Sequence, residues 1–315
     1  MASNPPLVFS HIGLHVEDLE QALNFFVDQL QLEVENRGKV DDPLIRALVE
    51  EPSAPLEGAR LHLPRAPAAI QLTENKSAKR IDNRHPNPGT CHLAFFTHDV
   101  ESTWSKLAST GCQLVSTGVI SVDTDVVSGT KAIYCIGPDG YRVEFMQGPG
   151  YLDGSSRDPD AIPNFQRANE FCHLGIQVED RDRSLAFYRD LLGIESIAEW
   201  VEVDPATKAI VGVPEAELNM AIMRLPGLSG THACFEVIEY QNTPREPVDT
   251  RNRNNGTFHL AFSVPDLDAM LQKLEEFGSP LLEPGVLVLP DGRRTLCCED
   301  PDGIRVQFIE AVPGS

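Results

Sequence analysis

The chain carries two sets of side chains, each with two histidines, one carboxylate and one amide, that could hold a metal ion. Two imidazoles and a carboxylate suit a divalent ion such as Fe, Mn, Co, Ni or Zn, and no thiolate accompanies them. Four protein ligands on a six-coordinate ion leave two positions for substrate or water, which favours catalysis over a purely structural role. The first set is His11, Gln71, His92 and Glu144, and the second is His173, Glu236, His259 and Gln307.

The alternation of side chains along a strand predicts that the members of a set share one face of a sheet. In the run that contains His11, Ile12 and Leu14 occupy the opposite face, and the other seven residues likewise alternate with aliphatic or aromatic neighbours. If the apolar faces pack beneath helices, a curled sheet brings the polar residues together on its far side. His15 shares a face with His11 and is the alternative ligand, but Gln177 takes its place in the second half.

Three motifs occur twice, so the chain is a tandem duplication. A long repeat that occurs only twice indicates two homologous domains, which agrees with a length of 315 residues. We predict a first domain at 7–148, a linker rich in Gly, Pro and Ser at 149–167, and a second domain at 168–312. The repeated motifs lie at 11–18 and 173–180, at 89–95 and 256–262, and at 138–145 and 301–308.

Hydrophobic periodicity predicts one order of elements in each quarter of the chain. A strand at 8–16 is followed by a helix that begins after Asp18, where an aspartate N-cap is expected. Strand-like runs follow at 32–36 and 44–49, and then at 60–63 and 69–73, which we interpret as one bent strand. Further helices are predicted at 100–110, 182–192 and 267–277, with Gly111 and Gly278 as stops. The pattern predicts an α+β fold with four βαβββ units, two per domain.

The composition disfavours several classes of partner. With 26 Lys and Arg against 47 Asp and Glu, the net charge of −21 disfavours binding to nucleic acid or to an anionic membrane. The chain contains no apolar run of about 18 residues and its first residues do not resemble a secretory signal, so we expect a cytoplasmic protein. Seven cysteines without a CxxC pair are expected to be reduced and buried. A small-molecule substrate is expected, and the chain is compatible with a monomer or a homodimer.

The repeated motifs resemble the vicinal oxygen chelate superfamily. The similar pattern is H-hydrophobic-G-hydrophobic-x-V-x-D with a following helix, then G-x-x-H-hydrophobic-A-F, then P-D-G-x-x-V-E/Q, and it covers almost the whole chain. The superfamily includes glyoxalase I, methylmalonyl-CoA epimerase, extradiol dioxygenases and bleomycin-binding proteins. The resemblance implies βαβββ units paired into two cupped mixed β-sheets, with ligands on the first and last strands of each unit at the eight positions named above. Relatives build clefts within one half or from one unit of each half, and the sequence leaves this choice open.

The resemblance also implies a reaction. The ligand set of the first half is similar to the epimerase type, and residues 69–75 resemble a glyoxalase strand with Gln71 in place of Glu. Such enzymes abstract a proton next to a metal-bound carbonyl. We therefore predict a metal-dependent isomerase, epimerase or lyase acting on a small carbonyl compound, with Glu144 as ligand and base and the first set as the catalytic one. The alternatives are an Fe(II) extradiol-type dioxygenase, whose usual motif histidine is replaced at 125–127, and a metal-free binding protein.

Overall fold

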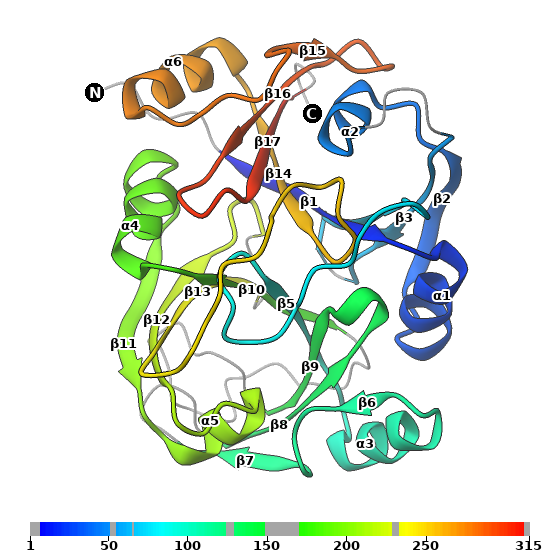
Figure 1. Ribbon diagram of the computed structural model, residues 1–315, viewed down its shortest axis with the longest axis vertical. Coiled ribbons are helices and arrows are strands. Elements are labelled where there is room, and N and C mark those ends of the chain that lie inside the picture. Colours follow the sequence, from blue (N-terminus) through cyan, green and yellow to red (C-terminus); the bar gives the residue numbers. More distant parts are fainter. Residues whose placement is uncertain are drawn as a thin grey trace.

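The protein is described by a computed structural model at residues 7–50, 55–64, 66–123, 129–148, 170–228 and 233–311. The described strands form two mixed sheets of eight and nine strands (Figure 1). These strands and their helices make four consecutive units, at 8–74, 91–147, 170–241 and 258–310. The linker predicted at 149–167 lies outside the described residues.

Units one and three share one order of elements, in which a short second helix separates the second strand from the last two. Unit one contains β1 (Val8–Val16), α1 (Leu19–Leu23), the π-helical η1 (Asn24–Gln29), β2 (Glu33–Lys39), α2 (Pro43–Leu48), β3 (Glu57–His62) and β4 (Ala69–Glu74). Unit three contains β10 (Glu170–Val178), α4 (Arg181–Leu185), the π-helical η3 (Ala186–Leu191), β11 (Ser196–Glu202), α5 (Pro205–Val211), β12 (Glu217–Arg224) and β13 (Cys234–Gln241).

Units two and four each begin with a strand and a regular α-helix. Unit two contains β5 (Cys91–Phe96), α3 (Val100–Ser109), β6 (Gln113–Leu114), β7 (Ile120–Val122), β8 (Thr130–Ile136), the 3₁₀ turn η2 (Pro138–Gly140) and β9 (Arg142–Gln147). Unit four contains β14 (Phe258–Val264), α6 (Leu267–Phe277), β15 (Leu287–Val288), β16 (Arg294–Glu299) and β17 (Arg305–Glu310).

The units pair across the two halves of the chain, and not within them. Units one and four form the outer-unit sheet, in the order β15-β16-β17-β14-β1-β4-β3-β2. Units two and three form the inner-unit sheet, in the order β11-β12-β13-β10-β5-β9-β8-β6, with β7 beside β8. The sequence left the partner of each unit open, and the structure pairs the units across the halves. The choice stayed open because every unit offers a similar first strand for antiparallel pairing, so the repeat specifies the unit but not its partner.

The expected helix signals are confirmed where an aspartate precedes the helix. Asp18 accepts a hydrogen bond from the Gln21 backbone N–H at 3.0 Å, and the aspartates before α3, α4 and α6 make the equivalent bond. Helix α6 ends at Gly278, whose backbone is left-handed at φ 81°.

Two predicted strands differ from the structure. The run at 44–49 is helical, because Asp42 caps the N–H groups of Leu44 and Ile45 and Pro43 occupies the first turn of α2. Residues 60–63 and 69–73 do not form one bent strand, since they fall in β3 and β4, which pair antiparallel.

The apolar face of both sheets packs against the helices in one main core, as the alternation predicted. Ile12, Leu14, Leu93 and Leu174 are fully buried there. All seven cysteines are free thiols, and six are buried while Cys112 is partly exposed, which confirms the expectation for them. None of the described helices is long and apolar enough to span a membrane.

Candidate metal centre

Four of the eight predicted ligand residues converge in the inner-unit sheet. The Nε2 atom of His173 lies 3.0 Å from Oε2 of Glu144 and 3.5 Å from Oε2 of Glu236. The Nε2 atom of His92 lies 3.3 Å from the same Glu236 oxygen and 3.0 Å from Nε2 of His173. All four side chains are buried. His92, His173 and Glu236 offer ligand atoms that all lie within 4.8 Å of one another. Glu144 joins this group through His173, and we call the four residues the inner site.

The spacing of these atoms fits a divalent ion. Ligand atoms about 2.1 Å from one ion stand about 3.0 Å apart at neighbouring corners of an octahedron and about 3.4 Å apart in a tetrahedron. The separations among the ligand atoms of His92, His173 and Glu236 run from 3.0 to 3.5 Å, and the Glu144 carboxylate lies 3.0 Å from His173. Borderline ions such as Zn accept this mixture of nitrogen and oxygen ligands. The donor set and its spacing therefore fit the metal that the sequence predicts.

Strand register brings the four residues together. His92 lies on β5 and His173 on β10, the two antiparallel central strands, where Gly175 pairs with His92. Glu144 lies on β9, in register with Ala94 of β5, and Glu236 lies on β13, in register with Gly175. Ligands on the first and last strands of two units therefore meet at the centre of the sheet.

Gly175 leaves the space that the His92 ring occupies. A Cβ atom at Gly175 would overlap the His92 imidazole, and a Cβ atom at Gly13 would overlap the imidazole of His259 in the outer-unit sheet. The glycine of each H-x-G motif is thus explained by packing, because it faces a histidine of the partner unit. The two contacts also agree with the pairing of unit three with unit two and of unit one with unit four.

A chain of hydrogen bonds fixes the orientation of His92. The Gln177 amide lies 3.2 Å from Nδ1 of His92 and 2.9 Å from the Thr90 hydroxyl, which is 2.8 Å from the Asn87 carbonyl. The two ends of a glutamine amide are assigned from such networks. In the structure Nε2 of Gln177 faces Nδ1 of His92, and Oε1 accepts from the Thr90 hydroxyl. Turning the amide over would give every donor an acceptor, with Nδ1–H of His92 donating to Oε1, Nε2–H donating to Thr90 and the Thr90 hydroxyl donating to Asn87. That orientation leaves the Nε2 lone pair of His92 directed at the inner site.

The remaining four predicted ligands lie in the outer-unit sheet. The rings of His11 and His259 are 5.6 Å apart there, against 5.0 Å for His92 and His173. The carboxylate positions hold Gln71 on β4 and Gln307 on β17, in register with Gly13 and Ala261. His15, the alternative ligand, has its Nε2 3.3 Å from Nδ1 of His259, at the place that Gln177 takes beside His92.

The grouping of ligands by halves is therefore wrong. The set His11, Gln71, His92 and Glu144 and the set His173, Glu236, His259 and Gln307 each divide between the two sheets. Pairing across halves instead collects both carboxylates in one sheet and both amides in the other. In the sequence, the two glutamates lie in units two and three and the two glutamines in units one and four. This distribution predicts one acidic site only once the pairing of the units is known.

The carboxylates control the charge of the inner site. Burial alone would lower the pKa of His173, but the charge of Glu236 and the hydrogen bond and charge of Glu144 outweigh burial and raise that pKa. Burial and the same two carboxylates raise the pKa of the Tyr134 hydroxyl well above its ordinary value, so Tyr134 stays a neutral phenol.

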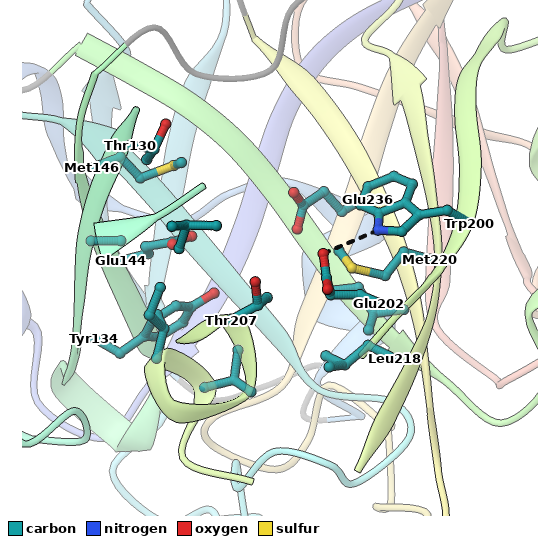
Figure 2. A pocket seen from close by; sticks show the side chains of 15 residues that line it. Thr130, Tyr134, Glu144, Met146, Trp200, Glu202, Thr207, Leu218, Met220 and Glu236 are labelled. Carbon is teal, nitrogen blue, oxygen red and sulfur yellow. Dashed lines mark hydrogen bonds between the residues drawn. The ribbon is translucent and has the colours of Figure 1, made fainter. Parts of the chain in front are cut away.

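A pocket with a cavity volume of about 50 Å³ opens beside the inner site (Figure 2). Glu144 and Glu236 face it from opposite walls, and most of the remaining lining is apolar. Helix α5 contributes Thr207, Ile210 and Val211 and packs against β7 and β8 of the partner unit.

Sequence reasoning missed several residues around the site. Glu202 lines the pocket and accepts a hydrogen bond from the Trp200 indole N–H at 3.3 Å. The ring of His85, from the polar segment before β5, lies 5.5 Å from the ring of His92, and its Nδ1 is 2.9 Å from the Tyr240 hydroxyl. Glu202 continues the alternation of a strand, but loop residues such as His85 have no periodicity that could reveal them.

The sequence was also compared with known protein families. The model of the Glyoxalase/Bleomycin resistance protein/Dioxygenase superfamily matches residues 8–145 and 171–308. The chain belongs to this superfamily. The two matched segments correspond to the two halves of the duplication, and each spans two βαβββ units.

Several superfamily members share the tandem layout over nearly their whole length. Glyoxalase I of Saccharomyces cerevisiae is 21% identical over 329 residues, covering 98% of this chain and 94% of that protein. Lactoylglutathione lyase of Schizosaccharomyces pombe is 23% identical, covering 96% and 95%. Among solved structures, glyoxalase I of Zea mays has a TM-score of 0.64 at 18% identity, covering 96% of this chain and 92% of that one. This structural likeness concerns the fold.

Proposed function

We propose that this superfamily member is a divalent-metal-dependent lyase of the glyoxalase type, which moves a proton next to the carbonyl of a small substrate. The observation that carries the proposal is a pair of buried carboxylates beside an apolar pocket: Glu236 contacts both His92 and His173, and Glu144 contacts His173. The full-length relatives named glyoxalase I and lactoylglutathione lyase support this class of reaction.

His92, Glu144, His173 and Glu236 would hold the ion, and any of the predicted metals Fe, Mn, Co, Ni or Zn accepts such ligands. When bound, the ion would supply Lewis-acid stabilisation of negative charge on the substrate oxygen.

The chain's own residues would move the proton. Glu144 has 9% of its side chain exposed, against 2% for Glu236, and both line the pocket. We assign the base to Glu144, because a base must reach the substrate carbon as well as its own anchoring partners. Apolar walls that include Met146, Leu218 and Ile238 would exclude water from the carbon that loses its proton.

The pocket lining also bears on the substrate. Its described charged residues are Glu144, Glu202 and Glu236, without a lysine, an arginine or a histidine. Such a lining disfavours a substrate with negative charge at the reacting end. We therefore propose that the substrate is a weakly charged carbonyl compound, as the sequence predicted. We also propose, as the sequence predicted, that the protein is cytoplasmic.

The dioxygenase alternative fits the site less well. The Fe(II) oxygenase triad consists of two histidines and one carboxylate with open positions for substrate and oxygen. In the inner site His92, His173 and Glu236 supply two histidines and one carboxylate, and Glu144, 3.0 Å from His173, would be a second carboxylate. With Glu144 as a fourth protein ligand, one of the positions that the oxygen chemistry uses would be taken.

Metal stoichiometry tests the proposal. Purified protein, stripped by a chelator and reloaded with each candidate metal, should bind one equivalent per chain by elemental analysis. Lactoylglutathione turnover is the first assay, since a full-length relative is named for it. We expect turnover of this or a related carbonyl substrate to disappear on stripping and to return on reloading. Protein that stays metal-free after reloading would contradict the proposal, as would oxygen consumption with a catechol.

A further inference from the structure

A second, larger cleft lies on the outer-unit sheet, around His11 and Gln71. It is open to solvent and has a cavity volume of about 760 Å³. Strands β2 and β3 of unit one form one side, and Leu289, Arg293 and Ile309 of unit four form the other. The cleft occupies the place in this sheet that the inner site and its pocket occupy in the other.

The two clefts differ in the charged residues that line them, and in the outer cleft Arg37, Arg60 and Arg293 pair with Glu20, Glu35 and Asp291 behind the lining. The described lining of the outer cleft contains Arg37, Lys39, Arg60 and Arg293 against Asp41 and Asp42. The lining of the inner pocket contains three glutamates and no basic residue among the described positions. A lining with more cations than anions stands out in a chain with a net charge of −21. Local charge of one sign in a concave site concentrates ligands of the opposite sign.

Arg60 and Arg293 approach the floor of the outer cleft from two different units. Burial lowers the pKa of His11 well below its ordinary value, and the charges of His259, Arg60 and Arg293 lower it further. His11 is therefore a neutral hydrogen-bonding group at the base of a cationic cleft. Gln71 adds an amide beside it. A dication would meet the two guanidinium groups there without a carboxylate at either ligand position.

Both guanidinium groups are held in place and keep donors for a ligand. Glu35 accepts from Nε of Arg60 at 2.8 Å, and Asp291 pairs with Nε and Nη2 of Arg293 at 2.7 and 2.6 Å. A guanidinium carries a planar fork of N–H donors, so these ion pairs leave further donors on each group. Two such forks match the oxygen pairs of a carboxylate or a phosphate.

We propose that the outer cleft binds a small organic anion, with a carboxylate or a phosphate group held between Arg60 and Arg293, and that it does so without a metal. His11 and Gln71 would contact the polar part of the same ligand. This site is separate from the inner site, so the two sheets, each built from one unit of either half, have diverged into a metal centre and an anion site.

Calorimetric titration of the full metal-loaded chain with succinate and, separately, with inorganic phosphate tests the proposal at low ionic strength. We expect one equivalent of at least one probe to bind, and the probe that binds identifies the anionic group. The double substitution Arg60→Gln and Arg293→Gln should weaken this binding at least about tenfold. Failure of both probes to bind would overturn the proposal.

A matched control separates the site from general charge. The double substitution Arg84→Gln and Arg224→Gln removes the same charge from two exposed arginines that line neither cleft. It should change the affinity less than about twofold, and an equal loss in both double variants would reject a specific site. Glu236→Gln should remove the metal and leave anion binding intact, so failure of the anion site and failure of the proposed function give different results. Circular dichroism checks that each variant folds.

Discussion

The inner-unit and outer-unit sheets repeat one geometry and differ in charge. Both place two histidines on antiparallel central strands, and both keep a glycine where a histidine ring crosses the partner strand. At the two remaining ligand positions, the inner sheet has Glu144 and Glu236 and the outer sheet has Gln307 and Gln71. The comparison indicates that the fold preserves the position of a site after duplication, while the carboxylates decide whether a dication can stay there.

The energetic reason is the cost of burying positive charge. A dication leaves water only if its ligands replace the hydration shell and balance the charge, and neutral imidazoles and amides do not balance it. In the outer sheet the guanidinium groups of Arg60 and Arg293 already act on His11. The same scaffold therefore favours a cation in one sheet and an anion in the other.

The largest expected effect comes from making the inner site resemble the outer one. Glu236→Gln creates the amide that the outer sheet has at Gln71, and we expect loss of stoichiometric metal because one of two anionic ligands is gone. Glu144→Gln should lower kcat by about 10²–10⁴, the usual contribution of a general base. Elemental analysis and steady-state kinetics measure both effects. Gln71→Ala is the matched control, and the comparison fails if this variant loses as much metal or activity as Glu236→Gln.

The reverse change tests whether charge alone explains why one sheet is expected to bind metal and the other is not. Restoring carboxylates with Gln71→Glu and Gln307→Glu should raise the metal content from one equivalent toward two per chain. We expect the new site to be weaker than the inner site, because Arg60 and Arg293 oppose a cation at His11. Metal titration at two ionic strengths measures the second equivalent. Unchanged stoichiometry would mean that backbone or ring geometry, and not only charge, has diverged.

The glycines offer a change that displaces a ligand without altering charge. In Gly175→Ala the new methyl group overlaps the His92 ring, which must move, so metal affinity should fall by about 10–100-fold. Gly13→Ala makes the same overlap with His259 in the outer sheet and should leave metal affinity unchanged. Both variants are expected to lose stability to a similar extent, and thermal unfolding checks this. Equal metal loss in the two variants would show a general folding defect.

Much of the unit, but not the pairing of units, could be read from the sequence. Strand alternation at His11, His92, His173 and Glu236 identified the ligand-bearing faces, since period-two patterns report which side of a sheet is polar. The partner of a strand is a long-range property, and in a duplicated chain β1 and β10 offer nearly the same edge, so local patterns do not choose between them. At α2 the error was local. The apolar spacing of residues 44–49 was interpreted as a strand, although Asp42 and Pro43 mark the start of a helix.

Substitutions of Gln177 test whether a residue that is not a metal ligand supports the inner site by orienting the His92 ring. Gln177→Leu removes the amide that contacts Nδ1 of His92, so the imidazole can rotate or take the other tautomer, and metal affinity should fall by about 10-fold. Gln177→Glu keeps an acceptor at this position and should retain most of the affinity. His15→Leu is the matched change beside His259 and should have no effect. The support role is rejected if the glutamate and leucine variants bind metal equally.

The smallest expected effect concerns the joint between the two sheets. The Tyr188 hydroxyl, in unit three, donates a 2.7 Å hydrogen bond to the Asp300 carboxyl of unit four. At the equivalent joint of units one and two, Phe26 and Gly137 replace this pair. The two joints thus differ in polarity although they connect equivalent units.

Burial raises the pKa of Asp300 to about 7, and the hydrogen bond from Tyr188 opposes this shift. The folded chain therefore binds more protons than the unfolded chain between the ordinary carboxyl pKa of about 4 and about 7, and this group's contribution to the free energy of unfolding falls as pH rises through that window. Tyr188→Phe removes a bond that is stronger to the charged form, so it should cost about 1 kcal/mol at pH 5 and more at pH 8. Urea unfolding of both proteins at the two pH values measures the difference, in which titration of His173 cancels because it is common to both. A loss that is equal at pH 5 and pH 8 would show that Asp300 does not ionise in the folded protein over this range.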